Sequence, residues 1–188
     1  MKTFLSAFAG GLSGGAFVRG FVFTLALTAA PLAHAGAIPA PVTLAQSMTV
    51  ANEAVQVCAT KGYKVVATVV DPDGVIKVQA RGDGGPVHSL RFSFRKAYTT
   101  VSMGPMFGVD TSSGVISFIT SKNPAGLSNI ASGSADLLFL PGGVLIKAQG
   151  QPAGAIGVSG APLSTEDEAC AQAGIAKIQS ELDAPAGR

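Results

Sequence analysis

The segment 64–81 constrains the fold more than any other, because it predicts two antiparallel strands joined by a tight turn. Its first part, KVVATVV (64–70), is rich in β-branched residues and too short for a stable helix. The next four residues, DPDG (71–74), predict a turn in which proline presets φ, aspartate bonds the nearby backbone and glycine adopts a positive φ. The part VIKVQAR (75–81) returns beside the first strand. Such a hairpin requires an antiparallel sheet.

Three more short strands are predicted at 135–140, 144–148 and 153–158. Their separators, PGG and QGQ, are short enough for tight turns between antiparallel neighbours. Several glycines in and around the last strand lack the spacing of a nucleotide-binding loop, and they indicate close packing of a helix on the sheet. These glycines are Gly150, Gly154, Gly157 and Gly160.

Helical patterns separate the groups of strands. A first helix is predicted after the N-cap Thr43 and ends at Gly62, and a second begins at Val87. The stretch 103–113 is expected to be irregular, and a weak third helix is predicted at 112–121. This order of elements predicts one α/β (α+β) domain in which helices cover the faces of the sheet.

The last helix is expected to begin with a capping box formed by Thr165 and Glu168, and to stop at Pro185. Apolar residues spaced by three and four predict the buried faces of the first two helices. These faces are Leu44, Met48, Ala51, Val55 and Cys58 in the first helix, and Leu90, Phe94, Ala97 and Val101 in the second.

The first 35 residues have the pattern of a secretory signal peptide. Lys2 and Arg19 precede an apolar run at 21–33, and small residues surround the end of the run. The run is shorter than the roughly 20 residues needed to cross a bilayer. We therefore expect cleavage after Ala35, a single domain at 36–188, a periplasmic or secreted location and no stable membrane anchor. An uncleaved anchor is the alternative.

The charge content excludes two classes of protein. Charged residues make up 13% of the chain and hydrophobic residues 47%, which excludes an intrinsically disordered chain. Of the 13 Lys and Arg residues, those outside the leader balance the 11 Asp and Glu residues. A neutral chain is not suited to general nucleic-acid binding, which needs excess positive charge. It also lacks long-range repulsion between copies, which favours self-association.

Cys58 and Cys170 are the only cysteines, and neither belongs to a zinc-binding pattern. Both fall in predicted helices near opposite ends of the mature domain. An exported chain meets an oxidising compartment, so the pair suggests a disulfide. Two buried thiols that act as small hydrophobic groups are the alternative.

Two longer segments carry a family resemblance. Residues 71–100 contain DPDG, RGDGG and RKAYTT, and residues 142–174 contain GAIGVSG and DEACAQAG. With these motifs, the sequence between 43 and 180 resembles the GlcG/HbpS-like haem-binding family, which is related to the C-terminal domain of PduO-type proteins. The sequence departs from the family pattern at Gly85 and Phe94.

The resemblance implies a profilin-like fold with a five-stranded antiparallel sheet and helices on both faces. It also implies a homo-oligomer and a haem (tetrapyrrole) ligand, because several family members bind haem and one group is linked to haem or iron sensing. Other members are associated with 2-hydroxy-acid metabolism. The alternative function is therefore a small-molecule enzyme or accessory factor acting on 2-hydroxy or oxo acids. A purely structural oligomer is a third possibility.

His88 is the only histidine outside the leader, and it follows a glycine-rich loop at the start of a helix. Imidazole is a common ligand of haem iron, which makes His88 the candidate metal ligand. A surface histidine without a ligand is the alternative. A second axial ligand could come from another subunit, from Met103 or Met106, or from a hydroxyl such as that of Thr99.

Arg91 and Arg95 are one helical turn apart, and paired guanidinium groups suit the two carboxylates of haem or a small acid. Arg81, on the preceding loop, could line the same site or pair with Asp83. The alternative is a solvated helix face or contacts between subunits. Lys96 matches the Lys-Ala pair of the family pattern, and this match supports it as a candidate ligand-binding residue.

Asp167 and Glu168 match the Asp-Glu pair of the family pattern. Helix capping explains both residues without a ligand. The functional interpretation is a pair of site carboxylates placed near Lys96. In the alternative function, these three residues form the centre of the site, although the sequence contains no motif for a redox cofactor.

Overall fold

The computed structural model describes residues 40–184, which belong to the unit Gly36–Arg188. The predicted signal peptide and Pro185 lie outside these residues. Within 40–184, no helix is both long and apolar enough to cross a bilayer. The elements are α1 (Leu44–Thr60), β1 (Val66–Val70), β2 (Ile76–Arg81), α2 (Val87–Phe107), α3 (Ser112–Lys122), α4 (Gly126–Gly133), β3 (Gly143–Ala148), β4 (Gln151–Ser159), α5 (Ser164–Ala176) and α6 (Gln179–Leu182).

The sheet is antiparallel, with strand order β2-β1-β4-β3. The predicted hairpin is confirmed as β1 and β2. In its turn, Oδ1 of Asp71 accepts hydrogen bonds from the N–H groups of Asp73 and Val75, both at 3.0 Å. A second hairpin joins β3 and β4 through Gln149 and Gly150, which have φ angles of 50° and 78°.

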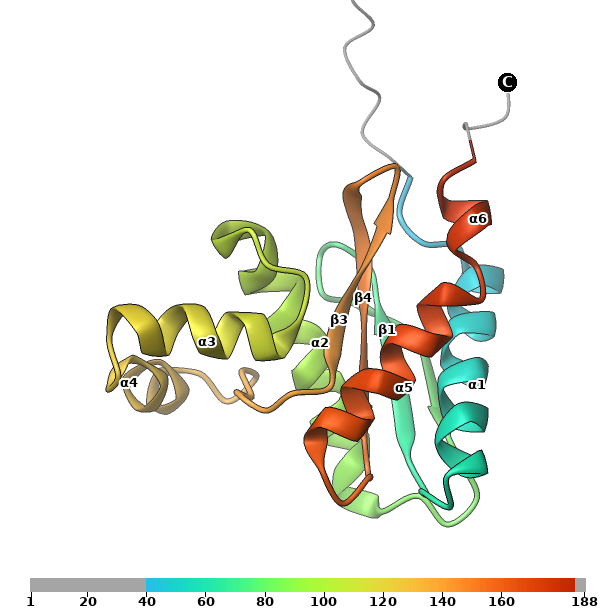
Figure 1. Ribbon diagram of the computed structural model, residues 1–188, viewed down its shortest axis with the longest axis horizontal. Coiled ribbons are helices and arrows are strands. Elements are labelled where there is room, and N and C mark those ends of the chain that lie inside the picture. The colour runs from blue at the N-terminus through green and yellow to red at the C-terminus, as the bar shows by residue number, and fades with distance from the viewer. Residues whose placement is uncertain (1–39, 185–188) are drawn as a thin grey trace, which may run out of the picture. The chain divides into compact units, whose positions relative to one another are not determined.

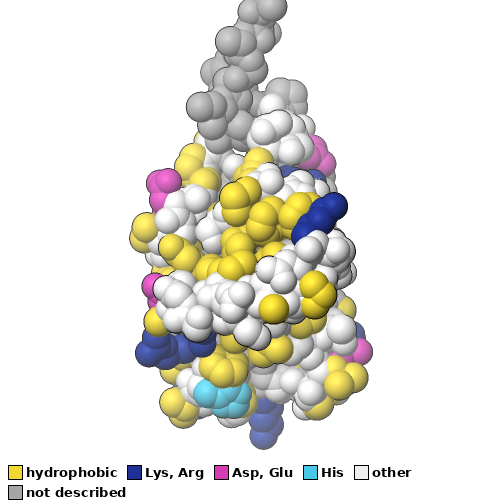
Figure 2. Space-filling view, turned by 90° about the vertical axis from the view of Figure 1, so that its left-hand side faces the viewer, with side chains coloured by type: hydrophobic (Ala, Val, Ile, Leu, Met, Phe, Trp, Pro, Cys, Tyr) yellow, Lys and Arg dark blue, Asp and Glu magenta, His cyan; other side chains and the backbone are white. Residues whose placement is uncertain are grey.

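The sheet described here has four strands, so the prediction of a fifth at 135–140 is wrong. The backbone of this segment bonds to side chains of α2 instead of to a neighbouring strand. The N–H of Leu138 donates to Oγ1 of Thr99 at 2.8 Å, and the carbonyl of Leu137 accepts from Arg95. Leu137 and Phe139 pack with α2, α3 and α4 in a small apolar cluster. Figure 2 looks onto this side, where hydrophobic side chains form a broad area with few charges.

Helices cover both faces of the sheet. Helices α1 and α5 lie side by side on one face, and α2 crosses the other (Figure 1). Alternate residues of β1 divide between these faces: Ala67 and Val69 belong to the core beneath α1 and α5, whereas Val70 packs beneath α2. The expected disulfide is confirmed, since Cys58 of α1 and Cys170 of α5 are bonded, with their Cα atoms 5.7 Å apart.

Glycines allow α2 to approach the sheet closely. A Cβ at Gly157 would lie 2.0 Å from the carbonyl oxygen of Ser93, and one at Gly143 would lie 2.1 Å from Oγ1 of Thr100. The prediction of close helix packing is confirmed for Gly157 and is wrong for the other three glycines. A Cβ at Gly154 or Gly160 would meet the backbone of Val70 or of Lys64 and Val65, at or just before β1, instead of a helix. Gly150 belongs to a turn and has no neighbouring atom in the way of a Cβ.

The helix boundaries confirm some predictions and correct others. The side chain of Thr43 accepts from the N–H of Gln46, so Thr43 is the N-cap of α1. Helix α2 continues through Pro105 to Phe107 instead of becoming irregular at 103, because proline in the last turn removes only one N–H donor. Helix α3 confirms the weak helix at 112–121. Helix α5 ends at Ala176, and the short helix α6 follows.

The buried helix faces are rotated relative to the predicted ones. In α1, Leu44 and Met48 are exposed and smaller residues face the core. In α2, Leu90 and Phe94 are only partly buried, whereas small and polar side chains lie against the sheet. The residues buried on α1 are Ser47, Val50, Ala51, Ala54 and Cys58, and those on α2 include Ser89, Ser93, Lys96, Ala97 and Thr100.

Candidate functional site

A cleft of about 340 Å³ lies between the N-terminal ends of α2 and α5. We call it the α2/α5 cleft. Three of its residues are spaced by four on α2, so that they share one face of the helix. The full lining is Pro86, His88, Phe92, Lys96, Leu140, Ser159, Gly160, Ala161, Ser164 and Asp167.

An exposed imidazole lies at the outer end of this row. His88 is in the first turn of α2 and is exposed. Its ring meets that of Phe92 edge to face, with 5.3 Å between the ring centroids and an interplanar angle of 73°. An aromatic neighbour in this geometry restricts the imidazole and adds an apolar surface beside it.

A buried ion pair lies at the inner end of the row. Nζ of Lys96 is 2.8 Å from Oδ2 of Asp167, and these side chains are 1% and 2% exposed. Lys96 also donates to the carbonyl of Val158 at 3.0 Å, and the N–H of Ala161 donates to Oδ1 of Asp167 at 2.9 Å. Gly142 leaves room for the pair, since a Cβ there would lie 2.8 Å from the lysine nitrogen.

Burial shifts both members of the pair toward their neutral forms. Loss of hydration lowers the pKa of Lys96, and the nearby Asp167 carboxylate opposes this change. Burial likewise raises the pKa of Asp167 against the attraction of Lys96. The lysine therefore releases its proton more readily than an exposed lysine does. Titratable groups with this environment in a cleft are typical of functional sites.

Glu168 does not line the cleft and instead caps another helix. Its carboxylate accepts hydrogen bonds from the hydroxyl groups of Ser112 and Ser113 and from the N–H groups of Ser113 and Gly142. The predicted capping box with Thr165 is wrong, because α5 has Leu163 at its N-cap and no side-chain cap. Glu168 is instead bonded to the start of α3.

Both helices that meet at the cleft begin without a side-chain cap. Pro86 precedes α2 and Leu163 precedes α5, and neither side chain bonds the first N–H groups of its helix. The first turns therefore present N–H donors and the positive end of the helix dipole. Because Pro86 and Ser164 line the cleft, both helix starts lie at it, and Glu166 and Asp167 add negative charge in the first turn of α5.

The predicted arginines lie outside the lining of the cleft. Arg91 is exposed, and Arg95 donates to the carbonyl of Leu137. Arg81 donates from Nε to the carbonyl of Gly85 at 2.7 Å. His88 therefore shares its cleft with Lys96 and Asp167 instead of with the guanidinium groups. The expected proximity of Asp167 to Lys96 is present, while a role of any of these residues in ligand binding stays a prediction.

The same-chain candidates for a second iron ligand are too far from His88. Along α2, at 1.5 Å per residue, Thr99, Met103 and Met106 lie about 16, 22 and 27 Å from it. Oγ1 of Thr99 already accepts the N–H of Leu138. These residues cannot coordinate the same iron atom as His88 of their own chain. Within 40–184, no group of three or more His, Cys, Asp or Glu side chains could hold a free metal ion.

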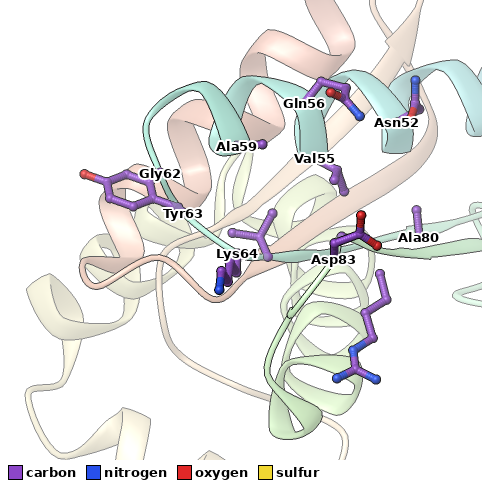
Figure 3. Close-up of a pocket in the computed structure, with 12 residues that line it drawn as sticks. Asn52, Val55, Gln56, Ala59, Gly62, Tyr63, Lys64, Ala80 and Asp83 are labelled. Atoms are coloured by element: carbon purple, nitrogen blue, oxygen red, sulfur yellow. The ribbon is translucent and has the colours of Figure 1, made fainter.

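A second, larger cavity of about 490 Å³ lies between α1 and the β1–β2 hairpin (Figure 3). We call it the α1/β2 cavity. Val55 and Gln56 of α1 contribute to one side and Asp83 to the other, and Arg81 belongs to the lining. The sequence did not predict this cavity.

Phe92 lines the α2/α5 cleft and was also not predicted from the sequence. Its spacing of four residues from His88 on the same helix was the available signal.

Comparison with known proteins shows the family. A family model described as "Haem degrading protein HbpS-like" matches residues 42–176. A crystal structure of HbpS is 34% identical, with a TM-score of 0.64, and the match covers 73% of this chain and 90% of that one. A double mutant of HbpS from Streptomyces reticuli is 30% identical, with a TM-score of 0.64 and coverage of 89% and 99%.

A crystal structure of a PduOC–haem complex is similar in fold, at 22% identity and a TM-score of 0.62, with coverage of 72% and 94%. Among curated proteins, no match was found. The matched family and the fold agree with the resemblance carried by the GAIGVSG and DEACAQAG motifs. The chain belongs to the HbpS-like family of haem degrading proteins.

Proposed function

We propose that this protein binds haem in the α2/α5 cleft, with His88 as the iron ligand. The observation that carries the proposal is the exposed imidazole of His88, which lies at the cleft and against the ring of Phe92. Histidine is a common axial ligand of haem iron, and aromatic side chains pack well on flat rings. The HbpS relatives and the haem complex of PduOC support the choice of ligand.

The rest of the cleft fits the anionic edge of haem. The uncapped starts of α2 and α5 offer N–H donors to carboxylates, which replaces the predicted role of the arginine pair. The cleft volume of about 340 Å³ is at the lower end of the range for ligand sites, so a bound haem would remain partly exposed. Haem supplies redox-active iron when bound, and the chain positions it.

The protein acts outside the cytoplasm in this proposal, as a haem-handling or haem-sensing component. The Cys58–Cys170 disulfide supports export, because disulfides persist in oxidising compartments. A homo-oligomer would bring a second chain to the apolar area seen in Figure 2. Light scattering of the purified protein measures the subunit number.

Titration with hemin, followed by absorbance, tests the proposal. We expect a saturable Soret band from the wild type and a loss of about tenfold or more in affinity for His88→Ala, which corresponds to at least about 1.4 kcal/mol. Arg91→Ala is the matched control, because Arg91 is exposed on the same helix but does not line the cleft. A wild type without a saturable band contradicts haem binding. Equal affinities for wild type and His88→Ala contradict the assignment of the ligand.

A further inference from the structure

Lys96 differs from the other lysines that form ion pairs in the described residues. The side chains of Lys61, Lys147 and Lys177 are 41%, 37% and 58% exposed, whereas that of Lys96 is 1% exposed. Haem binding as proposed above uses the imidazole and the helix starts, and it gives no role to this amine. Lys96 nevertheless lines the α2/α5 cleft beside Asp167.

Stability alone does not explain a buried ion pair of this kind. Removing two charges from water costs several kcal/mol per ion, and apolar residues of similar volume often serve a core as well or better. The α2 side of the sheet tolerates small apolar groups nearby, such as Ala97 and Ala155. Both members of the pair line the α2/α5 cleft, and this position points to a chemical use.

We propose that Lys96 is a nucleophilic amine that captures a small carbonyl compound in the α2/α5 cleft as an imine, with Asp167 as the proton carrier. The inference does not depend on haem binding, although it places the reaction in the same cleft. The ligand class is a short aldehyde or ketone, since the Lys96 side chain is only 1% exposed and a carbonyl carbon is the usual partner of a reactive lysine.

The proton balance of the step closes within the pair. Asp167 first takes a proton from the Lys96 ammonium, which leaves a neutral amine and a carboxylic acid 2.8 Å apart. The nitrogen lone pair forms a bond to the carbonyl carbon, and the C–O π electrons move to oxygen, giving a carbinolamine after proton transfer from nitrogen to oxygen. The acid of Asp167 then protonates the hydroxyl group, which leaves as water. The products are an iminium on Lys96 and a carboxylate on Asp167.

Burial favours each part of this step. Because burial lowers the pKa of Lys96, a larger fraction of its amine is free at neutral pH than for an exposed lysine. The carboxylate that receives the proton is held in place by the N–H of Ala161. The iminium that forms is a cation, so it restores the ion pair with Asp167 and is protected from hydrolysis by the limited access of water.

Reductive trapping tests the inference on the full chain without haem. The protein is incubated near neutral pH with propionaldehyde and cyanoborohydride, and the rate of modification of each lysine is followed by peptide mass spectrometry. Lys147 is the matched control, because it also pairs with an aspartate, Asp110, but at the surface. We expect Lys96 to be modified several-fold faster than Lys147, because burial lowers the pKa of Lys96 and leaves more of its amine unprotonated.

An unmodified Lys96, or one that reacts no faster than Lys147, overturns the inference. The comparison is made within the wild-type protein, so it does not depend on whether a variant folds. Asp167→Asn adds a second readout. Loss of the carboxylate lowers the pKa of Lys96 further and frees more amine, so a ratio of the Lys96 rate to the Lys147 rate that falls in spite of this identifies Asp167 as the proton carrier, and an unchanged or higher ratio contradicts that role. A modified Lys96 without any hemin-induced Soret band would support this inference and refute haem binding, and the reverse result would do the opposite.

Discussion

The two faces of the sheet differ in chemistry. The face beneath α1 and α5 is almost entirely apolar and is closed by the Cys58–Cys170 disulfide. The face beneath α2 contains hydroxyl groups and the buried ion pair, with the Thr68 and Ser93 oxygens 2.7 Å apart. Every residue of β1 is buried, whichever face it belongs to, so burial alone does not separate the two faces there.

This difference indicates a division of labour between the two faces. Apolar burial and a covalent bond stabilise the α1/α5 side without offering polar groups to a ligand. Desolvated polar groups on the α2 side contribute little net stability, but they depend on one arrangement of helix and sheet. The cleft opens on that second side, so the side that stabilises the fold less supplies the reactive groups.

The largest expected effect is loss of the disulfide. Replacing both Cys58 and Cys170 by alanine opens a loop with a sequence separation of 112, and we expect the free energy of unfolding to fall by about 4 to 5 kcal/mol. Urea unfolding of the wild type and the double variant measures the change. A loss below about 1 kcal/mol would show that the α1/α5 side does not depend on the bond.

Breaking the ion pair is the corresponding test on the α2 side. Lys96→Met leaves Asp167 buried without its cationic partner and should lower the free energy of unfolding by about 3 to 5 kcal/mol, whereas Lys96→Met with Asp167→Leu should recover most of that loss. Lys147→Met, which breaks an exposed pair with Asp110, should cost about 1 kcal/mol or less. Equal losses of free energy of unfolding for the buried and the exposed ion pair would contradict the difference that we infer between them.

The close approach of α2 predicts a smaller effect. Gly157→Ala places a Cβ against backbone atoms of Ser93 and Ala97 and should destabilise the fold by about 1 to 3 kcal/mol. Gly133→Ala, at the end of α4 with no atom in the way, should be neutral or slightly stabilising. Thermal unfolding of both variants measures the difference, and similar melting temperatures would contradict the packing argument.

The smallest effect is a pH dependence. Burial raises the pKa of Asp167, and removal of Lys96 strengthens this rise because its charge opposes it. Above the unfolded-state pKa and up to the folded-state pKa, the folded protein binds more protons, so its stability increases as the pH falls. The loss in free energy of unfolding caused by Lys96→Met, relative to the wild type, should therefore be smaller at about pH 5 than at about pH 7. Urea unfolding at both values checks the sign, and a growing deficit would contradict it.

Local chemistry made much of the fold predictable. The DPDG turn, the Thr43 cap and the β-branched strands act through neighbouring residues, and all three are present. The segment 135–140 has an equally apolar sequence, yet it is not a strand because Thr99 and Arg95 of α2 take its backbone groups. That competition depends on tertiary structure, which a single sequence does not reveal.

The site was predictable only in part for the same reason. The family pattern pointed to Lys96 and Asp167, and the chemistry of imidazole pointed to His88. The structure brings these three residues to one cleft. Burial of Lys96 could not be predicted from helical periodicity, because Gly143 and Gly157 have no side chains and admit a polar helix face. The partners of Glu168 could not be predicted, because the groups that donate hydrogen bonds to it, at 112, 113 and 142, are distant in sequence.

Blocking each of the two cavities tests most directly whether the ligand belongs to the α2 side. Ser164→Trp fills the α2/α5 cleft, and Gln56→Trp fills the α1/β2 cavity (Figure 3). In hemin titrations, we predict that Ser164→Trp loses about tenfold or more in affinity, while Gln56→Trp binds as the wild type does. Loss of binding in Gln56→Trp with normal binding in Ser164→Trp would contradict the account.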